Sequence, residues 1–452
     1  MHPILILLIA VAAVFILIIR LRVNAFVALI SAAILIGILS PDMPIDEVVP
    51  AVGERFGRVV GSIGIAIAMA AIIGQCLMES GSADRITRRF VAWLGEKRSS
   101  LSLVASGYVL SIPVFSDTVF YLLVPLARSM SARMGGRNYV LNVLSISAGG
   151  SATHVFVPPT PGPLVMAATL GVDLGIVILV GLFVALPASF FGWLYSLWID
   201  RKLNIPMREA PGLSLDELEK IATRPEDELP GFWVSLSPIG VPVIFIAAST
   251  IAGTFYKETG LARVTAFLGD PSFALLAGAV VSLAVLARHN CLSLKELAVP
   301  VEEAIKSAGV IILITAGGGA FGGMLVQAGV GEVLGRWAGE LGMSLMLLGF
   351  LLAMLVKVAQ GSGTVAMITA SAIMAPLLLS ADLAYHPVYV LMSIGSGALI
   401  GTWMNDSGFW VFRTMTGLTE IETLQTKTVL LVVLGLTGFA VSLLGSVIFP
   451  LV

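Results

Sequence analysis

Charged residues are scarce in this sequence of 452 residues. Asp, Glu, Lys and Arg together make up 12% of the chain, whereas soluble domains carry about 25%. Hydrophobic residues make up 57%, and the mean hydropathy is +0.99. Many apolar runs reach the ~20 residues that a helix needs to cross a bilayer. The composition therefore excludes an ordinary soluble protein and predicts an all-α polytopic membrane protein.

Cysteine is also scarce, and the common catalytic motifs are missing. The two cysteines, Cys76 and Cys291, lie in or beside apolar runs, so we expect no disulfide and no metal site. The sequence contains no HExxH, no GxSxG and no Walker-type Gly-Lys-Ser/Thr motif. The net charge of -2 gives no reason to expect a nucleic-acid partner. These absences argue against an enzyme and against bound cofactors.

The apolar runs predict ten membrane crossings. Residues 3–19 lack the basic start and the small-residue cleavage site of a signal peptide, so we interpret them as a retained first helix. The predicted crossings are 2–19, 24–39, 59–80, 139–168, 174–199, 233–255, 271–287, 307–328, 385–411 and 428–449. Two further apolar stretches remain, 99–127 and 343–381.

The charges beside these two stretches predict that each is a re-entrant hairpin. Basic residues flank 99–127 on both sides, so both of its ends are expected in the cytoplasm. The flanks of 343–381 are not basic, so both of its ends are expected outside. Each half then holds five crossings and one hairpin, and the odd number of crossings inverts the second half. We expect a first repeat over 1–199, a charged cytoplasmic linker over 200–231 and an inverted second repeat over 232–452.

The sequence also shows this duplication directly, because two segments recur at an offset of 246 residues. Residues 145–162 align with 391–408. Residues 115–119 align with 361–365 at the same offset. Each of these segments has a polar, Gly-rich or Pro-rich centre between apolar flanks. Inverted repeats with broken helices are typical of secondary transporters, whose substrate sites lie near the middle of the membrane.

The tips of the two predicted hairpins carry short hydroxyl residues. The first tip reads Ser-Asp-Thr over 116–118, and the second reads Ser-Gly-Thr over 362–364. Helix ends at such tips expose free N–H groups, which favour a carboxylate, and free C=O groups, which favour a cation. We therefore expect substrate to bind Ser116, Thr118, Ser362 and Thr364.

Two helix breaks complete the expected site. The run Pro158-Pro-Thr-Pro-Gly-Pro163 cannot continue a helix; a loop outside the membrane is the alternative. The second break, Asn405-Asp-Ser-Gly408, lies between apolar flanks, where an aspartate costs at least ~2.5 kcal/mol. Its alternative is a plain cytoplasmic helix end with the aspartate as a cap. We expect substrate to bind Thr160, Asn405 and Ser407.

Isolated titratable residues are the candidates for proton coupling. Asp117 lies mid-hairpin, far from basic residues, which suits a proton carrier; helix capping is its alternative role. His154 precedes the proline run by one turn, and a substrate or proton role competes with an ordinary core position. Lys357 precedes the second tip, and three roles are open to it. It could pair with a protein carboxylate, attract the substrate anion or extend to the outer surface. We assign proton coupling to Asp117, Asp406 and Lys357 and substrate binding to His154. For the proton itself, Asp117, Asp406 and His154 remain alternatives.

Five of these segments resemble the gluconate:proton symporter family, the gluconate permeases of the ion transporter superfamily. The matching segments are Pro113–Asp117, Leu123–Leu126, Pro158–Pro163, Ala359–Ala366 and Asn405–Trp410. The resemblance runs from about residue 60 to the C-terminus. It implies a bacterial inner-membrane carrier that imports gluconate or a related sugar acid by proton symport. It also implies a transport domain that moves against a scaffold, usually in a homodimer.

Two positions depart from the family pattern. Thr160 stands where the family usually has His, and the first tip differs from the commoner Phe-Phe-Glu or Phe-Phe-Asp. More distantly similar sodium-coupled dicarboxylate carriers have Ser-Asn-Thr at this tip, so Asp117 favours protons over sodium. The alternatives left open are sodium coupling and a different substrate, such as D-serine or a hydroxybutyrate. A channel is a further alternative, which saturable, gradient-driven accumulation would exclude.

Overall fold

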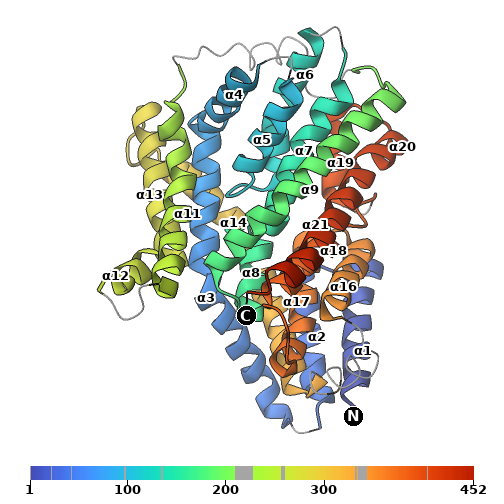
Figure 1. Ribbon diagram of the computed structural model, residues 1–452. Coiled ribbons are helices and arrows are strands. Elements are labelled where there is room, and N and C mark those ends of the chain that lie inside the picture. Colours follow the sequence, from blue (N-terminus) through green and yellow to red (C-terminus); the bar gives the residue numbers. More distant parts are fainter. Residues whose placement is uncertain are drawn as a thin grey trace.

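Every regular element that the structure describes is a helix. The computed structural model describes residues 2–21, 23–41, 43–95, 98–133, 136–208, 228–255, 260–330, 333, 344–404 and 406–451. Most of the long helices run along one axis of the molecule (Figure 1). This architecture agrees with the all-α membrane protein expected from the composition.

The first helices lie at one end of the molecule, at the bottom of Figure 1: α1 (Pro3–Phe15), its π-helical continuation η1 (Ile16–Arg20) and α2 (Ala25–Leu39). The long α3 (Ile45–Glu79) starts at this end and runs toward the other. Asn24 caps α2, since its side chain accepts a hydrogen bond of 2.9 Å from Phe26 N.

Helix α3 is longer than the crossing predicted at 59–80. It begins at Ile45 and runs through a charged first half. That half packs along α14 (Ala298–Gln327), where Arg55 Nη2 donates to Gln327 Oε1 at 2.7 Å. The charged residues lower the local hydropathy, so the hydropathy of the sequence did not indicate that the helix begins at Ile45.

Two helix pairs lie in opposite halves of the molecule. Helices α5 (Ser99–Leu110) and α6 (Ser116–Arg133) lie in the upper half of Figure 1, and α16 (Leu345–Gln360) and α17 (Gly363–Ser380) lie in the lower half. A short non-helical tip joins each pair. These pairs coincide with the stretches predicted as hairpins, although α6 continues past residue 127. Their re-entry into the membrane stays a prediction.

Two buried helices run to the centre of the molecule and break there. Helix α7 (Tyr139–Phe156) breaks before α8 (Pro161–Leu170), and α18 (Val388–Leu399) breaks before α19 (Ser407–Thr416). The segments between the helices are 157–160 and 400–406, so the first break overlaps the predicted run 158–163 and the second begins before the predicted 405–408. All residues of α18 are buried, and so are all residues of α7 except His154.

Glycines let α7 and α18 approach their neighbours closely. A Cβ on Gly149 of α7 would lie 2.1 Å from the carbonyl oxygen of Val104 on α5. A Cβ on Gly397 of α18 would likewise lie 2.1 Å from the carbonyl oxygen of Phe350 on α16. Small residues at helix contacts are how membrane helices pack without a hydrophobic driving force. The same close packing thus occurs in both halves of the chain.

The remaining helices surround these central ones. Helix α9 (Leu174–Leu203) packs on α7 and extends into the predicted linker, of which residues 209–227 lie outside the described residues. The C-terminal span packs on α18 and consists of α20 (Glu420–Thr423), π-helical η4 (Leu424–Thr428) and α21 (Val429–Ile448).

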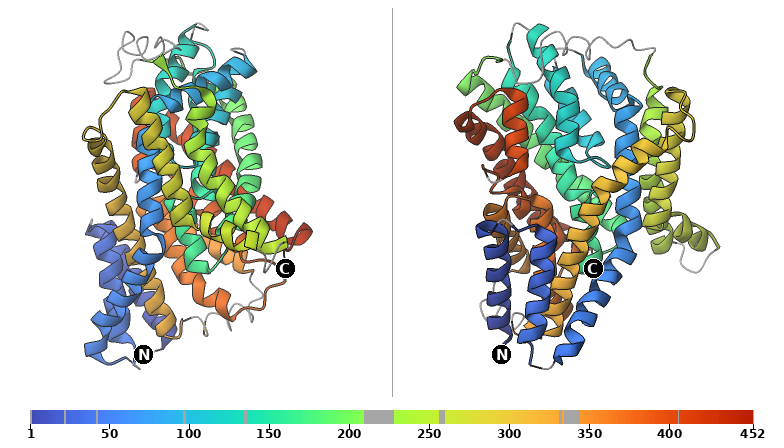
Figure 2. Two further views of the ribbon diagram at one scale, coloured as in Figure 1. Left: turned by 90° about the vertical axis from the view of Figure 1, so that its left-hand side faces the viewer. Right: turned by 180° about the vertical axis from the view of Figure 1, so that it is seen from behind.

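A flank of the molecule is built around α3 (Figure 2). It contains α11 (Phe232–Phe255), α13 (Pro271–His289), the short α12 (Gly260–Leu268) and α14. The amphipathic α4 (Ser82–Leu94) joins this flank to α5, and Arg85 of α4 donates to the carbonyl oxygen of Pro230 at 2.7 Å. The sequence predicted neither α4 nor α12.

Six helices in the described parts of the chain are long and apolar enough to cross a membrane, or seven if the bent α3 counts as one span. The six cover Tyr139–Leu170, Leu174–Leu203, Phe232–Gly253, Pro271–His289, Ala298–Gln327 and Glu420–Ile448. They coincide with six of the ten predicted crossings. The crossings predicted at 2–19, 24–39 and 385–411 correspond instead to the shorter apolar helices α1, α2 and α18.

Candidate functional site

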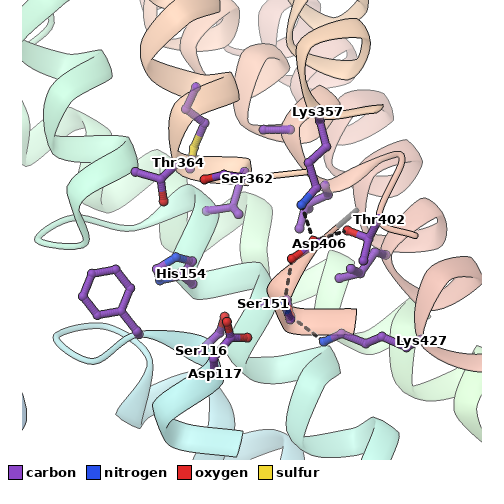
Figure 3. Close-up of a pocket in the computed structure, with 18 residues that line it drawn as sticks. Ser116, Asp117, Ser151, His154, Lys357, Ser362, Thr364, Thr402, Asp406 and Lys427 are labelled. Atoms are coloured by element: carbon purple, nitrogen blue, oxygen red, sulfur yellow. Dashed lines mark hydrogen bonds and ion pairs between the residues drawn. The ribbon is translucent and has the colours of Figure 1, made fainter. Parts of the chain in front are cut away.

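The tips of both helix pairs and the second helix break meet at one cavity of about 150 Å³ (Figure 3). Residues from α6, α7, α16, α17, α18, α19 and η4 line it, so both halves of the chain contribute. Its lining contains seven of the predicted site residues: Ser116, Asp117, His154, Lys357, Ser362, Thr364 and Asp406. It also contains polar residues that the sequence did not predict: Ser151, Thr402 and Lys427.

The two tips direct helix N-termini toward this cavity. Helix α6 starts at Ser116 and α17 starts at Gly363, so the non-helical tips are 111–115 and 361–362. The tip residues predicted at 116–118 and 363–364 lie in the first turns of these helices. Ser362 caps α17, because its Oγ accepts a hydrogen bond of 3.3 Å from Val365 N. The free N–H groups at a helix N-terminus carry partial positive charge, which favours a carboxylate. Both tips can therefore help to bind an anion.

A buried ion pair holds the second break together. The Lys357 ammonium donates to Asp406 Oδ2, and it also donates to the carbonyl oxygen of Gly361 at 2.5 Å. Asp406 caps α19 by accepting a bond of 2.8 Å from Gly408 N, and it accepts a second bond of 3.0 Å from Thr402 Oγ1. The side chains of Lys357 and Asp406 are only 5% and 13% exposed. Of the roles open to Lys357, the structure shows the pair with a protein carboxylate.

Asp117 lies close to this pair but does not join it. A Cβ on Gly408 would lie 3.1 Å from Asp117 Oδ1 and 3.3 Å from Asp406 Oδ1, so both carboxylates approach the same glycine. Asp117 lines the same cavity as Lys427, Asp406 and Lys357. Within the described part of the chain, Asp117 makes no ion pair. It is thus a carboxylate without a fixed charged partner in a half-buried position.

His154 faces the cavity from the last turn of α7. Its ring lies 5.5 Å from the ring of Phe115, centroid to centroid. Its Nδ1 atom is buried and has no hydrogen-bond partner in the described structure. A buried polar atom without a partner is costly, so the described structure leaves this ring atom unsatisfied beside the cavity.

Lys427 is the functional candidate that the sequence reasoning missed. It lies in η4, it is 7% exposed, and its ammonium donates to Ser151 Oγ at 3.4 Å. The predicted crossing began at residue 428, so this lysine was left outside the membrane span. A lone cation beside an apolar run is the signal that could have identified it, since such residues are costly in membranes.

Thr118 and Thr160 lie elsewhere, on a second cavity of about 80 Å³ between the first tip, the proline break, α3 and α14. The Thr160 hydroxyl is also occupied within the break. It lies 2.8 Å from the carbonyl oxygen of His154 and 2.8 Å from that of Val157. The structure therefore does not bring these two threonines together with the other predicted residues. Asn405 lies outside the described residues, and of Ser407 only the backbone is described, as the first residue of α19.

Taken together, the apolar spans and the buried, charged central cavity define a multi-pass membrane transporter. The family described as GntP family permease matches residues 2–448. The chain therefore belongs to this family, which confirms the resemblance seen in the sequence motifs. As a permease it is a transporter and not an enzyme.

Several proteins are similar to this chain over nearly its whole length. The gluconate permease of Pseudomonas aeruginosa is 33% identical over 447 residues, which cover 98% of this chain and 97% of that protein. The low-affinity gluconate transporter of Escherichia coli is 31% identical over 440 residues, which cover 96% of this chain and 95% of that protein. The structure of the Alcanivorax borkumensis YdaH transporter has the same fold, with a TM-score of 0.64, 15% sequence identity and coverage of 94% of this chain and 98% of that one.

Proposed function

We propose that this protein imports gluconate or a closely related sugar acid across the bacterial inner membrane by proton symport. The similarity to gluconate permeases supports the substrate class. The cavity supports a small acid, because it is polar, closed in by both halves of the chain and carries two lysines.

The observation that carries proton coupling is the charge balance of the cavity. Lys357 and Lys427 face Asp117 and Asp406, so the four charges cancel when both acids are ionised. A bound monocarboxylate then adds one negative charge to a largely buried site, which is costly without compensation. A proton on Asp117 neutralises that carboxylate and so offsets the charge that the substrate adds. Asp406 is the poorer candidate, since its carboxylate already accepts hydrogen bonds from Lys357, Thr402 and Gly408 N.

We further propose that the helices form two inverted repeats, 1–199 and 232–452, joined by the linker 200–231. The close contact of α5 with α7 and that of α16 with α18 support this, as do the matched breaks after α7 and α18. In this arrangement the tips and the broken helices form a transport domain that moves against α2, α3, α13 and α14. The family resemblance is the basis for expecting this elevator-type motion and a homodimer.

The test is uptake of radiolabelled gluconate by proteoliposomes, with inward proton and sodium gradients imposed separately. Accumulation driven by the proton gradient alone is the expected result. Accumulation driven only by sodium would contradict the proton role. No accumulation of gluconate under either gradient, with uptake of D-serine or hydroxybutyrate instead, would contradict the proposed substrate.

A further inference from the structure

We propose that Lys427 binds the carboxylate of the substrate and that the opposite wall of the cavity binds its hydroxyl groups. This inference rests on the proposed transport of a small hydroxy acid. One end of the cavity would bind the carboxylate and the other the hydroxyl groups. Lys427 belongs to no motif identified in the sequence.

The ammonium groups of the two cavity lysines differ in the partners that they already have. The ammonium of Lys357 is held by the Asp406 carboxylate and by the carbonyl oxygen of Gly361. Lys427 makes no ion pair within the described residues, and its single hydrogen bond there is the one of 3.4 Å to Ser151 Oγ. That distance is longer than the 2.7–3.2 Å typical of N–H···O bonds. An ammonium has three N–H donors, so Lys427 retains donors for a ligand.

The position of Lys427 also fits a ligand-binding role. It belongs to η4, a π-helical turn, and such turns occur often at functional sites. Its side chain is almost fully buried, and its ammonium lies 5.7 Å from the centre of the Phe412 ring. Figure 3 shows it pointing toward Ser151 and the neighbouring Asp117. Within the described residues no carboxylate lies at ion-pair distance from Lys427. When Asp117 takes up the proposed proton, one negative charge near Lys427 is lost, and a substrate carboxylate would replace it.

The part of the cavity away from Lys427 carries neutral hydroxyls beside the Lys357–Asp406 pair. Figure 3 shows Ser362 and Thr364 apart from Lys427, with Lys357 on the same side as Ser362 and His154 below Thr364. The His154 ring and these hydroxyls line the cavity, and such groups can donate to or accept from alcohol groups. The ligand class that matches both ends is a short monocarboxylate with hydroxyl groups along its chain. A polyol lacks the group for Lys427, and a fatty acid lacks the groups for the far wall.

The first experiment measures ligand-induced thermal stabilisation of the purified full-length protein in detergent. The probes are gluconate, lactate, hydroxybutyrate, sorbitol and hexanoate. We expect the hydroxy acids to stabilise the wild type, and both sorbitol and hexanoate to stabilise it much less. A wild type that no hydroxy acid stabilises, or that sorbitol stabilises as well as gluconate, overturns the inference.

The second experiment compares Lys427→Met and Lys427→Arg with a matched control, Lys306→Met, whose lysine lies on the surface and is 71% exposed. For the best acid of the first experiment, Lys427→Met should raise Kd and the transport KM by about 10- to 100-fold, the contribution of one hydrogen bond to a charged group. Lys427→Arg should raise them less, and Lys306→Met should not change them.

The split between KM and the maximal rate separates this role from a structural one. Loss of folded protein lowers the maximal rate and leaves KM unchanged, so an unchanged KM in Lys427→Met overturns the inference. If that variant does not survive purification, Lys427→Gln must show the same rise in KM. Sodium-driven uptake would contradict the proposed coupling, yet the dependence of affinity on Lys427 would remain.

Discussion

The two halves of the chain contribute different chemistry to the same cavity. The first half lines it with one acid, one histidine and hydroxyls, through Asp117, His154 and Ser116. Both lysines of the described lining, Lys357 and Lys427, come from the second half. The backbone features that the sequence repeats, a tip and a break in each half, thus carry different side chains. The comparison indicates that similar backbone features in the two halves present different side chains to the cavity.

The two helix breaks show the same contrast on a smaller scale. Prolines make the first break, and the Thr160 hydroxyl bonds two carbonyl groups there without any charge. Asp406 stabilises the second break by capping α19 and by pairing with Lys357. A break in a membrane helix therefore needs its free backbone groups satisfied, and either neutral or charged groups can do so. The second break thus differs from the first in the charged groups that it uses.

The largest expected effect comes from removing the charge at the second break. Asp406→Asn keeps a capping side chain but removes the carboxylate with which the buried Lys357 forms its ion pair. Breaking a buried ion pair costs about 3–5 kcal/mol, so we expect a strong drop in thermal stability and uptake near background. Melting in detergent and proteoliposome uptake are the two measurements.

A matched control for this variant is Asp270→Asn. Asp270 is exposed and caps α13 by accepting bonds of 3.0 Å from Ser272 N and 3.2 Å from Phe273 N. Asn is as good a cap as Asp, so neither melting nor uptake should change. The double variant Lys357→Met/Asp406→Asn should regain stability but not transport. If Asp406→Asn melts and takes up substrate like the wild type, the ion pair contributes neither to stability nor to transport.

The next effect in size concerns the acid of the first half. Asp117→Asn removes the proposed proton carrier and leaves both lysines and the second break in place. We expect loss of proton-driven accumulation, while exchange of labelled for unlabelled substrate across the membrane continues. Counterflow and gradient-driven uptake in the same proteoliposomes measure the two activities. Undiminished accumulation in this variant would falsify the proton role of Asp117.

The sequence predicted the parts of the site that depend on backbone geometry. Prolines and glycines interrupt helices locally, so the break before Pro161 and the tip at 361–362 could be located without a structure. The pairing partner of Lys357 could not be derived in the same way, because Asp406 lies 49 residues further along the chain and on another helix.

Side-chain direction and span boundaries were the features that the sequence did not resolve. Thr160 is inside the predicted break, but spacing alone does not show that it lines the second cavity with Thr118. Lys427 was not recognised as a site residue because the hydropathy rises only after it, so that the predicted crossing began at residue 428. The start of helix α3 was placed too late for a related reason. Its first half carries charged residues that pack against α14, and in the sequence such a charged segment is easily taken for a loop.

The smallest expected effect tests whether the first break is purely structural. Thr160→Val keeps the shape of the side chain and removes the hydroxyl that bonds two carbonyl groups. Because the loss leaves neutral buried acceptors, we expect about 1–3 kcal/mol of destabilisation, less than for Asp406→Asn. KM for gluconate should stay unchanged, since this hydroxyl lies away from the charged cavity. Thermal melting and uptake kinetics measure the two quantities, and a raised KM at unchanged stability would instead make the first break part of the substrate site.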